Sequence, residues 1–239
     1  MRRLPIPIIH RDDDLLIVSK PSGILVHRGW DNPKYTLVDL LREQLDIDRL
    51  HGVHRLDRGT SGIMVFALNL RAAQFISSAF RSRQVSKHYL ALVRGSFHFS
   101  GVLDHPVPKR PGEPRVDAQT AFQALATAPT VPRETSLVLA RPRTGRTHQI
   151  RRHLKHLNHP IIGDVNYGKG ELNRAAKARY DLHRLGLHAW CLELPHPSTD
   201  TVQQWTADIP PSLTEPLAAM GYDLAKLDKQ ASCFDGSHS

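Results

Sequence analysis

The sequence predicts an α+β fold on a mixed, largely antiparallel β-sheet that is flanked by helices and loops. Apolar strand patterns outnumber helical patterns, and several of them follow one another directly along the chain. Nothing in the composition marks a clean domain boundary. With 239 residues the chain is long enough for one substantial core. We therefore expect a single domain over residues 1–225 and a disordered tail over residues 226–239.

The first half of the chain predicts alternating strands and helices. Residues 15–19 are an apolar strand that ends at the turn sequence KPSG, and residues 24–27 resume it. Thr36 can cap a helix over residues 36–47, with Asp39 in its first turn. The remaining elements of this half are a strand over 63–68, a helix over 70–83 and a strand over 85–93.

The second half is richer in turn signals. Residues 100–116 carry four prolines and two glycines, which predicts a long loop or a hairpin. The turn sequence HPSTD joins two strand patterns over 187–194 and 201–209 and predicts a second hairpin. The other expected elements are strands over 115–126 and 135–140 and helices over 147–157 and 211–220.

Composition and charge favour a polyanionic partner. The net charge is +9 with histidine neutral, and the isoelectric point is about 9.9. The two cysteines form no CxxC pair, which argues against a disulfide framework or a cysteine zinc site. The N-terminus does not read as a signal peptide, and no apolar run approaches the roughly 18 residues of a membrane helix. We expect a cytoplasmic protein that does not span a membrane.

The segment HRLDRGTSG, residues 54–62, holds a carboxylate that could carry chemistry. Asp57 lies between Arg55 and Arg58, and Gly59 and Gly62 allow the backbone to bend before the next strand. An arginine next to a carboxylate favours the ionised form, which suits a nucleophile better than a general acid. From the residues alone, a solvated loop ion pair remains the commoner interpretation of such a pattern.

The segment RPRTGRTHQIRRHLK, residues 141–155, is strongly basic, and no acid occurs between Thr135 and Gly163. A basic loop that leads into a helix N-terminus is an anion-binding arrangement. Arg151 and Lys155 are four residues apart with the same charge, a conflict that a phosphate or a carboxylate from elsewhere would relieve. A solvated basic face is the alternative. The basic side chains are Arg141, Arg143, Arg146, Arg151, Arg152 and Lys155.

Two further patterns leave alternatives open. Strand alternation places Lys87 and Tyr89 on one face, where a tyrosine is most often part of the core. His153 and His156 have a spacing that could ligate a metal ion, but no HExxH motif and no nearby cysteine or acid supports such a site. We expect no metal site.

Taken together, six segments resemble the RluA-type pseudouridine synthases, and they occur in the order of that family over roughly residues 9–200. The pair HRLDxxTSG and RTHQIR is highly specific. Within the family, the subgroup that acts on uridine 65 of tRNA is the most similar. The matching segments are KPSGILVH (20–27), HRLDRGTSG (54–62), KHYLALVRG (87–95), TGRTHQIRRHL (144–154), HPIIGDVNYG (159–168) and LHAWCLELPHP (187–197).

The resemblance implies an enzyme that isomerises a uridine in the T-stem and acceptor region of tRNA after flipping the base out. Asp57 would be the catalytic carboxylate and Arg151 its ionic partner. Tyr89 would stack on the base and would be a candidate for removing the C5 proton, although an ordinary pKa of about 10 makes a tyrosine a poor base at neutral pH. Arg55 would fill the space that the base leaves. Other predicted RNA-binding residues are Arg58, Lys87, Arg141, Arg143, Arg146, His148, Arg152 and Lys155.

The same resemblance implies no cofactor, no obligate protein partner and a monomer. Residues 1–225 would form the catalytic domain, without a separate N-terminal RNA-binding domain. An enzyme for a ribosomal RNA stem-loop, or for both RNAs, is the alternative within this chemistry. An RNA-binding protein without catalysis and a histidine-ligated metallohydrolase are the alternatives outside it.

Overall fold

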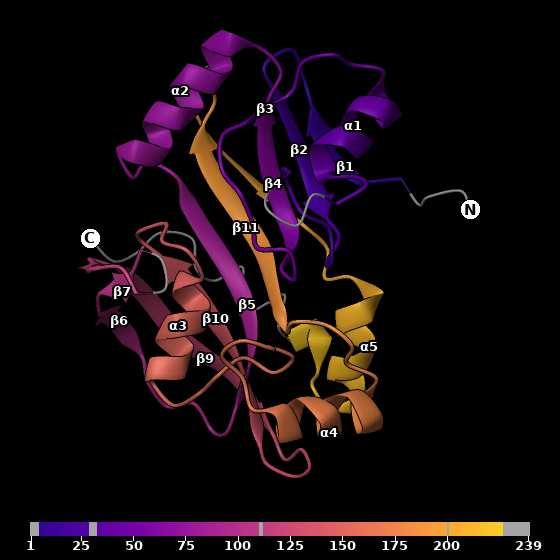
Figure 1. The fold of residues 1–239 in the computed structure, drawn as a ribbon, viewed down its shortest axis with the longest axis vertical. Helices are drawn as coiled ribbons and strands as arrows, with labels where there is room; N and C mark the ends of the chain where they lie inside the picture. Colours follow the sequence, from indigo (N-terminus) through magenta and orange to yellow (C-terminus); the bar gives the residue numbers. More distant parts are fainter. Residues whose placement is uncertain (1–4, 29–32, 110–111, 200, 227–239) are drawn as a thin grey trace. The chain divides into compact units, whose positions relative to one another are not determined.

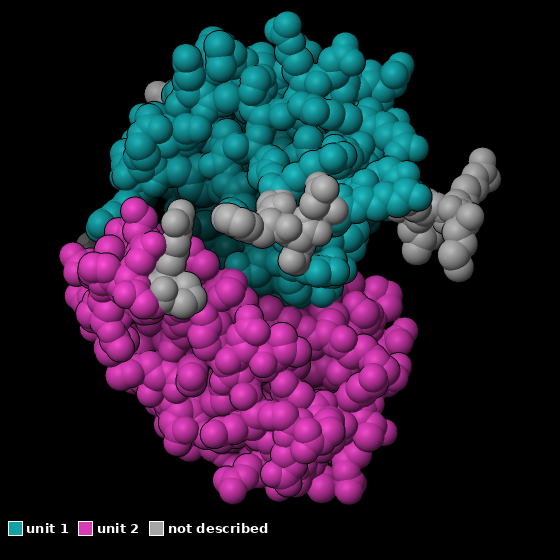
Figure 2. Space-filling view, viewed as in Figure 1, with its two compact units in different colours: residues 1–89, 141–144, 187–208 teal, residues 90–140, 145–186, 209–239 magenta. Residues whose placement is uncertain are grey.

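The structure, a computed structural model, describes residues 5–28, 33–109, 112–199 and 201–226. It divides into two compact units (Figure 2). Unit 1 comprises residues 1–89, 141–144 and 187–208, and unit 2 comprises residues 90–140, 145–186 and 209–239. Nearly all of the expected C-terminal tail lies outside the described residues. No helix among the described residues is both long and apolar enough to cross a membrane.

Unit 1 is built on a mixed sheet in which most neighbouring strands are antiparallel (Figure 1). The strand order is β1-β2-β4-β11, with β3 paired to β4 and β12 paired to β11. The β4–β11 pairing is parallel, which confirms the expected mixed sheet. These strands are β1 (Ile8–Arg11), β2 (Leu15–Lys20), β3 (His51–Gly52), β4 (Ser61–Ala67), β11 (Leu187–Pro195) and β12 (Val202–Thr206).

Two helices cover the apolar strands of unit 1. Helix α1 (Leu37–Leu45) begins with the predicted cap: the Thr36 hydroxyl accepts from the Asp39 backbone N–H, and the Asp39 carboxylate accepts from that of Thr36. Helix α2 (Leu70–Arg81) packs on β4 and β11 and is capped by the Asn69 side chain. Strands β2 and β4 are buried almost throughout, so the core of unit 1 lies around them.

Unit 2 combines an antiparallel sheet with three helices. Strands β6 (Gly101–Asp104), β9 (Gln119–Ala128) and β10 (Thr135–Pro142) are neighbours in the order β10-β9-β6, and β7 (Val107–Pro108) pairs with β8 (Arg115–Val116). Strand β5 (Ser86–Arg94) runs from unit 1 into unit 2. The helices are α3 (Gln149–His156), α4 (Gly170–Tyr180) and α5 (Pro211–Ala219), and α4 packs against α5.

The secondary structure differs from the expectations in two places. Residues 24–27 do not form a strand. Instead, the carbonyl oxygens of Leu25 and Val26 accept hydrogen bonds from the backbone N–H groups of Leu37 and Val38, the first two residues of α1. Helix α4 was not expected, because its sequence carries no apolar stripe, and Ala176 is its single fully buried residue.

Candidate active site

Asp57 lies in the loop that leads into β4, and its side chain is half-buried. The backbone turns directly after it, where the Thr60 N–H donates to the Asp57 carbonyl oxygen at 3.1 Å. Arg55 and Arg58 are exposed. Nε of Arg58 donates to the carbonyl oxygen of Gly23 at 3.0 Å, and the Gly23 N–H donates to the Arg58 carbonyl oxygen at 2.8 Å. The HRLD segment and the KPSG turn therefore hold each other in place.

A fully buried lysine joins the same two segments. The Lys20 ammonium donates to the carbonyl oxygens of Pro21 and Ile24 at 2.9 Å each, and to that of Arg58 at 3.3 Å. A buried charge is costly unless hydrogen bonds compensate it, and these carbonyl oxygens supply that compensation. The backbone next to Asp57 is consequently fixed from the interior of unit 1.

The residues after Asp57 attach the loop to β11. The Ser61 hydroxyl lies 2.8 Å from Nδ1 of His188, and Nε2 of His188 lies 3.1 Å from the Ala207 carbonyl oxygen. Since a carbonyl can only accept, Nε2 carries the proton and Nδ1 accepts from Ser61. Gly62 has φ +112°, and a Cβ there would lie 2.0 Å from the Ala189 carbonyl oxygen. Small residues in the TSG sequence thus permit the close β4–β11 contact.

Tyr89 lies on β5, half-buried, and packs against the core of unit 1. Burial raises the pKa of its phenol above the ordinary value, and the negative charge of Asp57 raises it further. The sequence left open whether Tyr89 is a core residue or a site residue, and the structure places it against the core of unit 1. At neutral pH its side chain is a neutral phenol within electrostatic reach of the Asp57 carboxylate.

Lys87, which also lies on β5, and His54 both lie near the ring of Phe80. The Lys87 ammonium lies 5.9 Å from the centre of the Phe80 ring, and burial lowers its pKa. Burial and the charge of Lys87 lower the pKa of His54 to about 3. The neutral His54 ring stacks on Phe80 at 5.0 Å, and its Nε2 accepts from the Val65 N–H at 3.1 Å. The role of His54 was not predicted, because a side chain that accepts a hydrogen bond from the backbone leaves no pattern in the sequence.

In unit 2, Arg151 forms a buried ion pair with Asp164. Its Nε and Nη2 donate to the two carboxylate oxygens at 2.7 and 2.9 Å. Burial acts to raise the pKa of Asp164, but the Arg151 bonds and the backbone N–H groups of Tyr167 and Asn166 outweigh it, so the pKa is lowered. This carboxylate from elsewhere in the chain relieves the like-charge pair of Arg151 and Lys155.

Tyr167, which was also not predicted, contacts four of the predicted residues. Arg151, Arg152 and Lys155 place their cationic groups 5.0, 5.9 and 5.7 Å from the centre of its ring. Nε of Arg152 donates to the phenol oxygen at 2.9 Å, and Nδ1 of His148 lies 3.0 Å from that oxygen. The one feature of the sequence that points to Tyr167 is its position in the segment HPIIGDVNYG, which carries part of the family resemblance.

The predicted site residues are divided between the two units. Arg143 and Arg146 are exposed, Arg141 is half-buried, and Nε of Arg146 donates to the Asp117 carbonyl oxygen at 3.0 Å. The members in unit 1 are Arg55, Asp57, Arg58, Lys87, Tyr89, Arg141 and Arg143. The members in unit 2 are Arg146, His148, Arg151, Arg152 and Lys155.

Among the residues that the structure describes, one group has metal-binding chemistry. Nδ1 or Nε2 of His88, Sγ of Cys191 and a carboxylate oxygen of Glu193 all lie within 4.8 Å of one another. Nitrogen, sulfur and oxygen donors of this kind suit Zn²⁺. His88 alternates with Lys87 and Tyr89 along β5, so it lies on the opposite face of the strand and takes no part in the site built around Asp57.

The histidines whose spacing suggested a metal site have structural partners instead. Nδ1 of His153 lies 2.9 Å from the Thr120 hydroxyl oxygen, and its Nε2 lies 2.8 Å from the His105 carbonyl oxygen. Both ring nitrogens are therefore engaged. The His156 ring stacks on that of His105 with 3.6 Å between their centres. His153 is therefore held by hydrogen bonds and His156 by ring stacking.

Comparison with known proteins identifies the family of the chain. The family model described as RNA pseudouridylate synthase matches residues 14–156. The chain is 39% identical over 214 residues to the tRNA pseudouridine synthase C of Haemophilus ducreyi, which covers 82% of this chain and 88% of that protein. It is 36% identical over 220 residues to the protein of the same name from Vibrio parahaemolyticus, covering 84% of this chain and 89% of that protein.

Two solved human structures have a similar fold. The human RNA pseudouridylate synthase domain containing 1 matches with a TM-score of 0.76 and 27% identity, over 98% of this chain and 97% of that one. The human RNA pseudouridylate synthase domain containing 4 matches with a TM-score of 0.70 and 27% identity, over 90% and 92%. The chain therefore belongs to the RNA pseudouridylate synthase family and is of its RluA type.

Proposed function

We propose that the protein isomerises a uridine of tRNA to pseudouridine, that uridine 65 in the T stem is its target, and that Asp57 is the catalytic carboxylate. The observation that carries the proposal is the position of Asp57 in unit 1, half-buried on a loop that Lys20 and Ser61 hold in place, within electrostatic reach of Tyr89. The tRNA substrate is supported by the names of the relatives, which the chain matches over most of its length.

The reaction is balanced without any added reactant. The bond from N1 of uracil to C1′ of the ribose breaks, the base turns, and C5 bonds to C1′. The proton on C5 leaves and N1 ends protonated. Asp57 can act as a nucleophile toward the nucleotide or as a negative charge that stabilises a cationic sugar. Because reactant and product are isomers, no redox group is needed.

Tyr89 is proposed to contact the uracil base as a neutral phenol. Its raised pKa disfavours the phenolate, so the hydroxyl is better suited to donate a hydrogen bond than to act as a resting base. Arg55, which is exposed beside Asp57, is proposed to occupy the space of the flipped base. Arg151, which pairs with Asp164 in unit 2, is proposed to be the arginine of the catalytic machinery.

The basic residues of the 141–155 segment, with Arg58 and Lys87, are proposed to contact RNA phosphates. About five such contacts would give a slope of log affinity against log salt of about −4 to −5. We propose residues 1–225 as the catalytic domain, working in the cytoplasm as a monomer on the T-stem and acceptor region of tRNA.

The test uses purified full-length protein and a tRNA transcript, with pseudouridine detected by carbodiimide treatment and primer extension. A stop at uridine 65 with the wild type, and none with Asp57→Asn at equal RNA affinity, is the expected result. Equal product from Asp57→Asn would overturn the role of the carboxylate. The same mapping on total RNA from a deletion strain identifies the natural target, and a missing stop in ribosomal RNA alone would overturn the tRNA assignment.

A further inference from the structure

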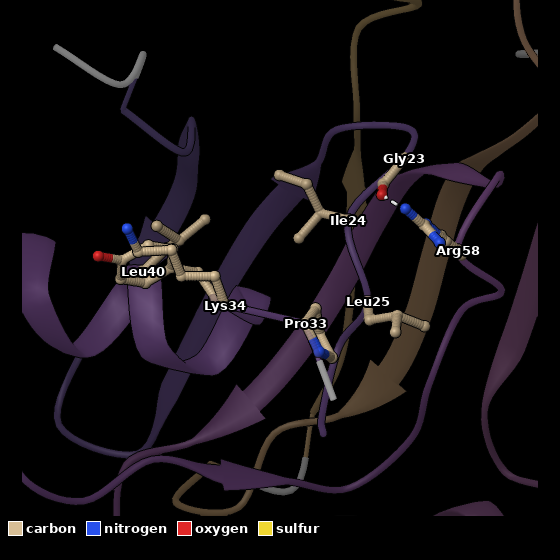
Figure 3. A pocket seen from close by; sticks show the side chains of 8 residues that line it. Gly23, Ile24, Leu25, Pro33, Lys34, Leu40 and Arg58 are labelled. Carbon is tan, nitrogen blue, oxygen red and sulfur yellow. Dashed lines mark hydrogen bonds between the residues drawn. The ribbon is translucent and has the colours of Figure 1, made fainter. Parts of the chain in front are cut away.

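Unit 1 contains a pocket of about 290 Å³ directly beside the Asp57 loop (Figure 3). One wall is the backbone segment that follows Lys20, and Arg58 closes one side. The other lining residues come from the segment that precedes α1 and from α1 itself. The lining residues are Gly23, Ile24, Leu25, Pro33, Lys34, Tyr35, Leu40 and Arg58.

The lining combines three kinds of surface. Ile24, Leu25 and Leu40 are half-buried and apolar, while Lys34 and Tyr35 are exposed. The Lys34 ammonium lies 5.7 Å from the centre of the Tyr35 ring, so a cation and an aromatic face occur together. An aromatic ring offers a stacking surface for a base, and a lysine or an arginine beside it offers a contact for a phosphate.

The size of the pocket limits its ligand. Sites for drug-sized molecules usually span about 300–1,000 Å³, so a pocket of about 290 Å³ suits a single base with its phosphate. A longer stretch of RNA would need a groove. A purely apolar ligand would leave the charges of Lys34 and Arg58 without a function in the pocket.

The pocket is tied to the catalytic loop through the backbone. The Gly23 N–H and the Lys20 ammonium both donate to the Arg58 carbonyl oxygen, one residue after Asp57. Arg58, which lines the pocket, follows Asp57 directly, and adjacent Cα atoms are about 3.8 Å apart. A strand that places one nucleotide at Asp57 therefore brings a neighbouring nucleotide within reach of the pocket.

We propose that this pocket is a subsite for one nucleotide that flanks the target uridine, with its base on Tyr35 and its phosphate at Lys34 and Arg58. The proposal rests on the proposed function, since it takes RNA as the substrate. The subsite holds the RNA strand in register with Asp57. It thereby acts on substrate binding and not on the bond-making step.

The experiment compares Tyr35→Leu and Lys34→Ala with the wild type. RNA affinity is measured by fluorescence anisotropy on a T-arm stem-loop at several salt concentrations, and KM and kcat by pseudouridine formation. Tyr35→Leu keeps apolar bulk and removes the stacking face, so we expect Kd and KM to rise about 5- to 100-fold with kcat nearly unchanged. Lys34→Ala should reduce the magnitude of the salt slope by about 1.

The matched control is Arg49→Ala, which removes a positive charge from an exposed residue of unit 1 that does not line the pocket. It should change Kd and the salt slope little. Unfolding midpoints in urea show that each variant is folded. Wild-type Kd and KM in Tyr35→Leu, or an effect of Arg49→Ala as large as that of Lys34→Ala, would overturn the subsite.

These outcomes are separate from a failure of the proposed function. If the wild type makes pseudouridine and Asp57→Asn does not, the function stands whatever the pocket variants do. If the wild type makes no pseudouridine, the anisotropy data still test the pocket as a place where RNA binds.

Discussion

The hydroxyl of Ser61 donates to Nδ1 of His188, a residue 127 positions further along the chain, over 2.8 Å. Both side chains are buried, and Ser61 begins the strand that follows the Asp57 loop. His188 in turn donates to the Ala207 carbonyl oxygen. This chain of hydrogen bonds positions the loop and takes no direct part in the proposed chemistry.

Replacement of Ser61 by alanine should weaken this attachment. Loss of a buried hydrogen bond costs about 1–3 kcal/mol, so the free energy of unfolding in Ser61→Ala should fall by that amount. It is measured by urea denaturation, with Ser78→Ala as the control, because Ser78 is exposed on α2. A stability equal to that of the wild type would contradict the role given to this hydrogen bond.

Gly62 should tolerate no side chain. Alanine there combines a left-handed φ of +112° with a Cβ 2.0 Å from the Ala189 carbonyl oxygen, and we expect Gly62→Ala to lose at least about 3 kcal/mol of stability. Two variants separate the causes. Gly101→Ala has φ +133° in open space, and Gly145→Ala meets nothing within 4 Å. If Gly62→Ala loses no more than Gly101→Ala, the contact with β11 is not the cause.

The pH dependence of the reaction should show no ionisation of Tyr89. Its pKa is raised, so the phenol keeps its proton from pH 6 to pH 9, and kcat/KM should not rise with phenolate formation in that range. Tyr89→Phe should lower kcat/KM about 10- to 100-fold without changing the shape of the profile. Tyr180→Phe is the control. A wild-type rate that rises tenfold per pH unit up to pH 9, and a flat profile in Tyr89→Phe, would identify a resting base instead.

Local sequence was sufficient for much of the fold. The cap at Thr36, the helix that became α2 and the hairpin of β11 and β12 follow from residues next to one another in the sequence, because their hydrogen bonds are local. The prediction of a strand over residues 24–27 was wrong, because the carbonyl groups of an apolar run can accept hydrogen bonds from a helix N-terminus as well as from a neighbouring strand. That choice depends on where α1 packs, which the sequence pattern does not contain.

The candidate site, like the fold, could be predicted only in part from the sequence. The motif resemblance identified Asp57, Tyr89 and Arg151 as candidates, but not the groups that hold them. Lys20 finds carbonyl acceptors, and Asp164 reaches Arg151 from 13 positions away through a tertiary contact. Such partners are determined by the folded backbone, so no spacing rule locates them.

The buried ion pair of Arg151 and Asp164 should stabilise the folded protein. Removal of one member of a buried pair leaves the other without compensation, so Asp164→Asn should lower the free energy of unfolding by about 3–5 kcal/mol near pH 7. Asp164→Glu keeps the charge and should lose less. Asp208→Asn, at an exposed aspartate, should change stability little.

The pH dependence of that loss follows from the lowered pKa of Asp164 in the folded state. The stabilisation is complete above the unfolded pKa of about 3.9 and disappears as the pH falls toward the folded pKa, because the carboxyl group then takes up a proton. The difference in stability between the wild type and Asp164→Asn should therefore be constant from pH 7 to about pH 5 and shrink toward pH 3. Urea denaturation at each pH measures it, and a difference that stays constant down to pH 3 would show that the charge of Asp164 does not stabilise the fold.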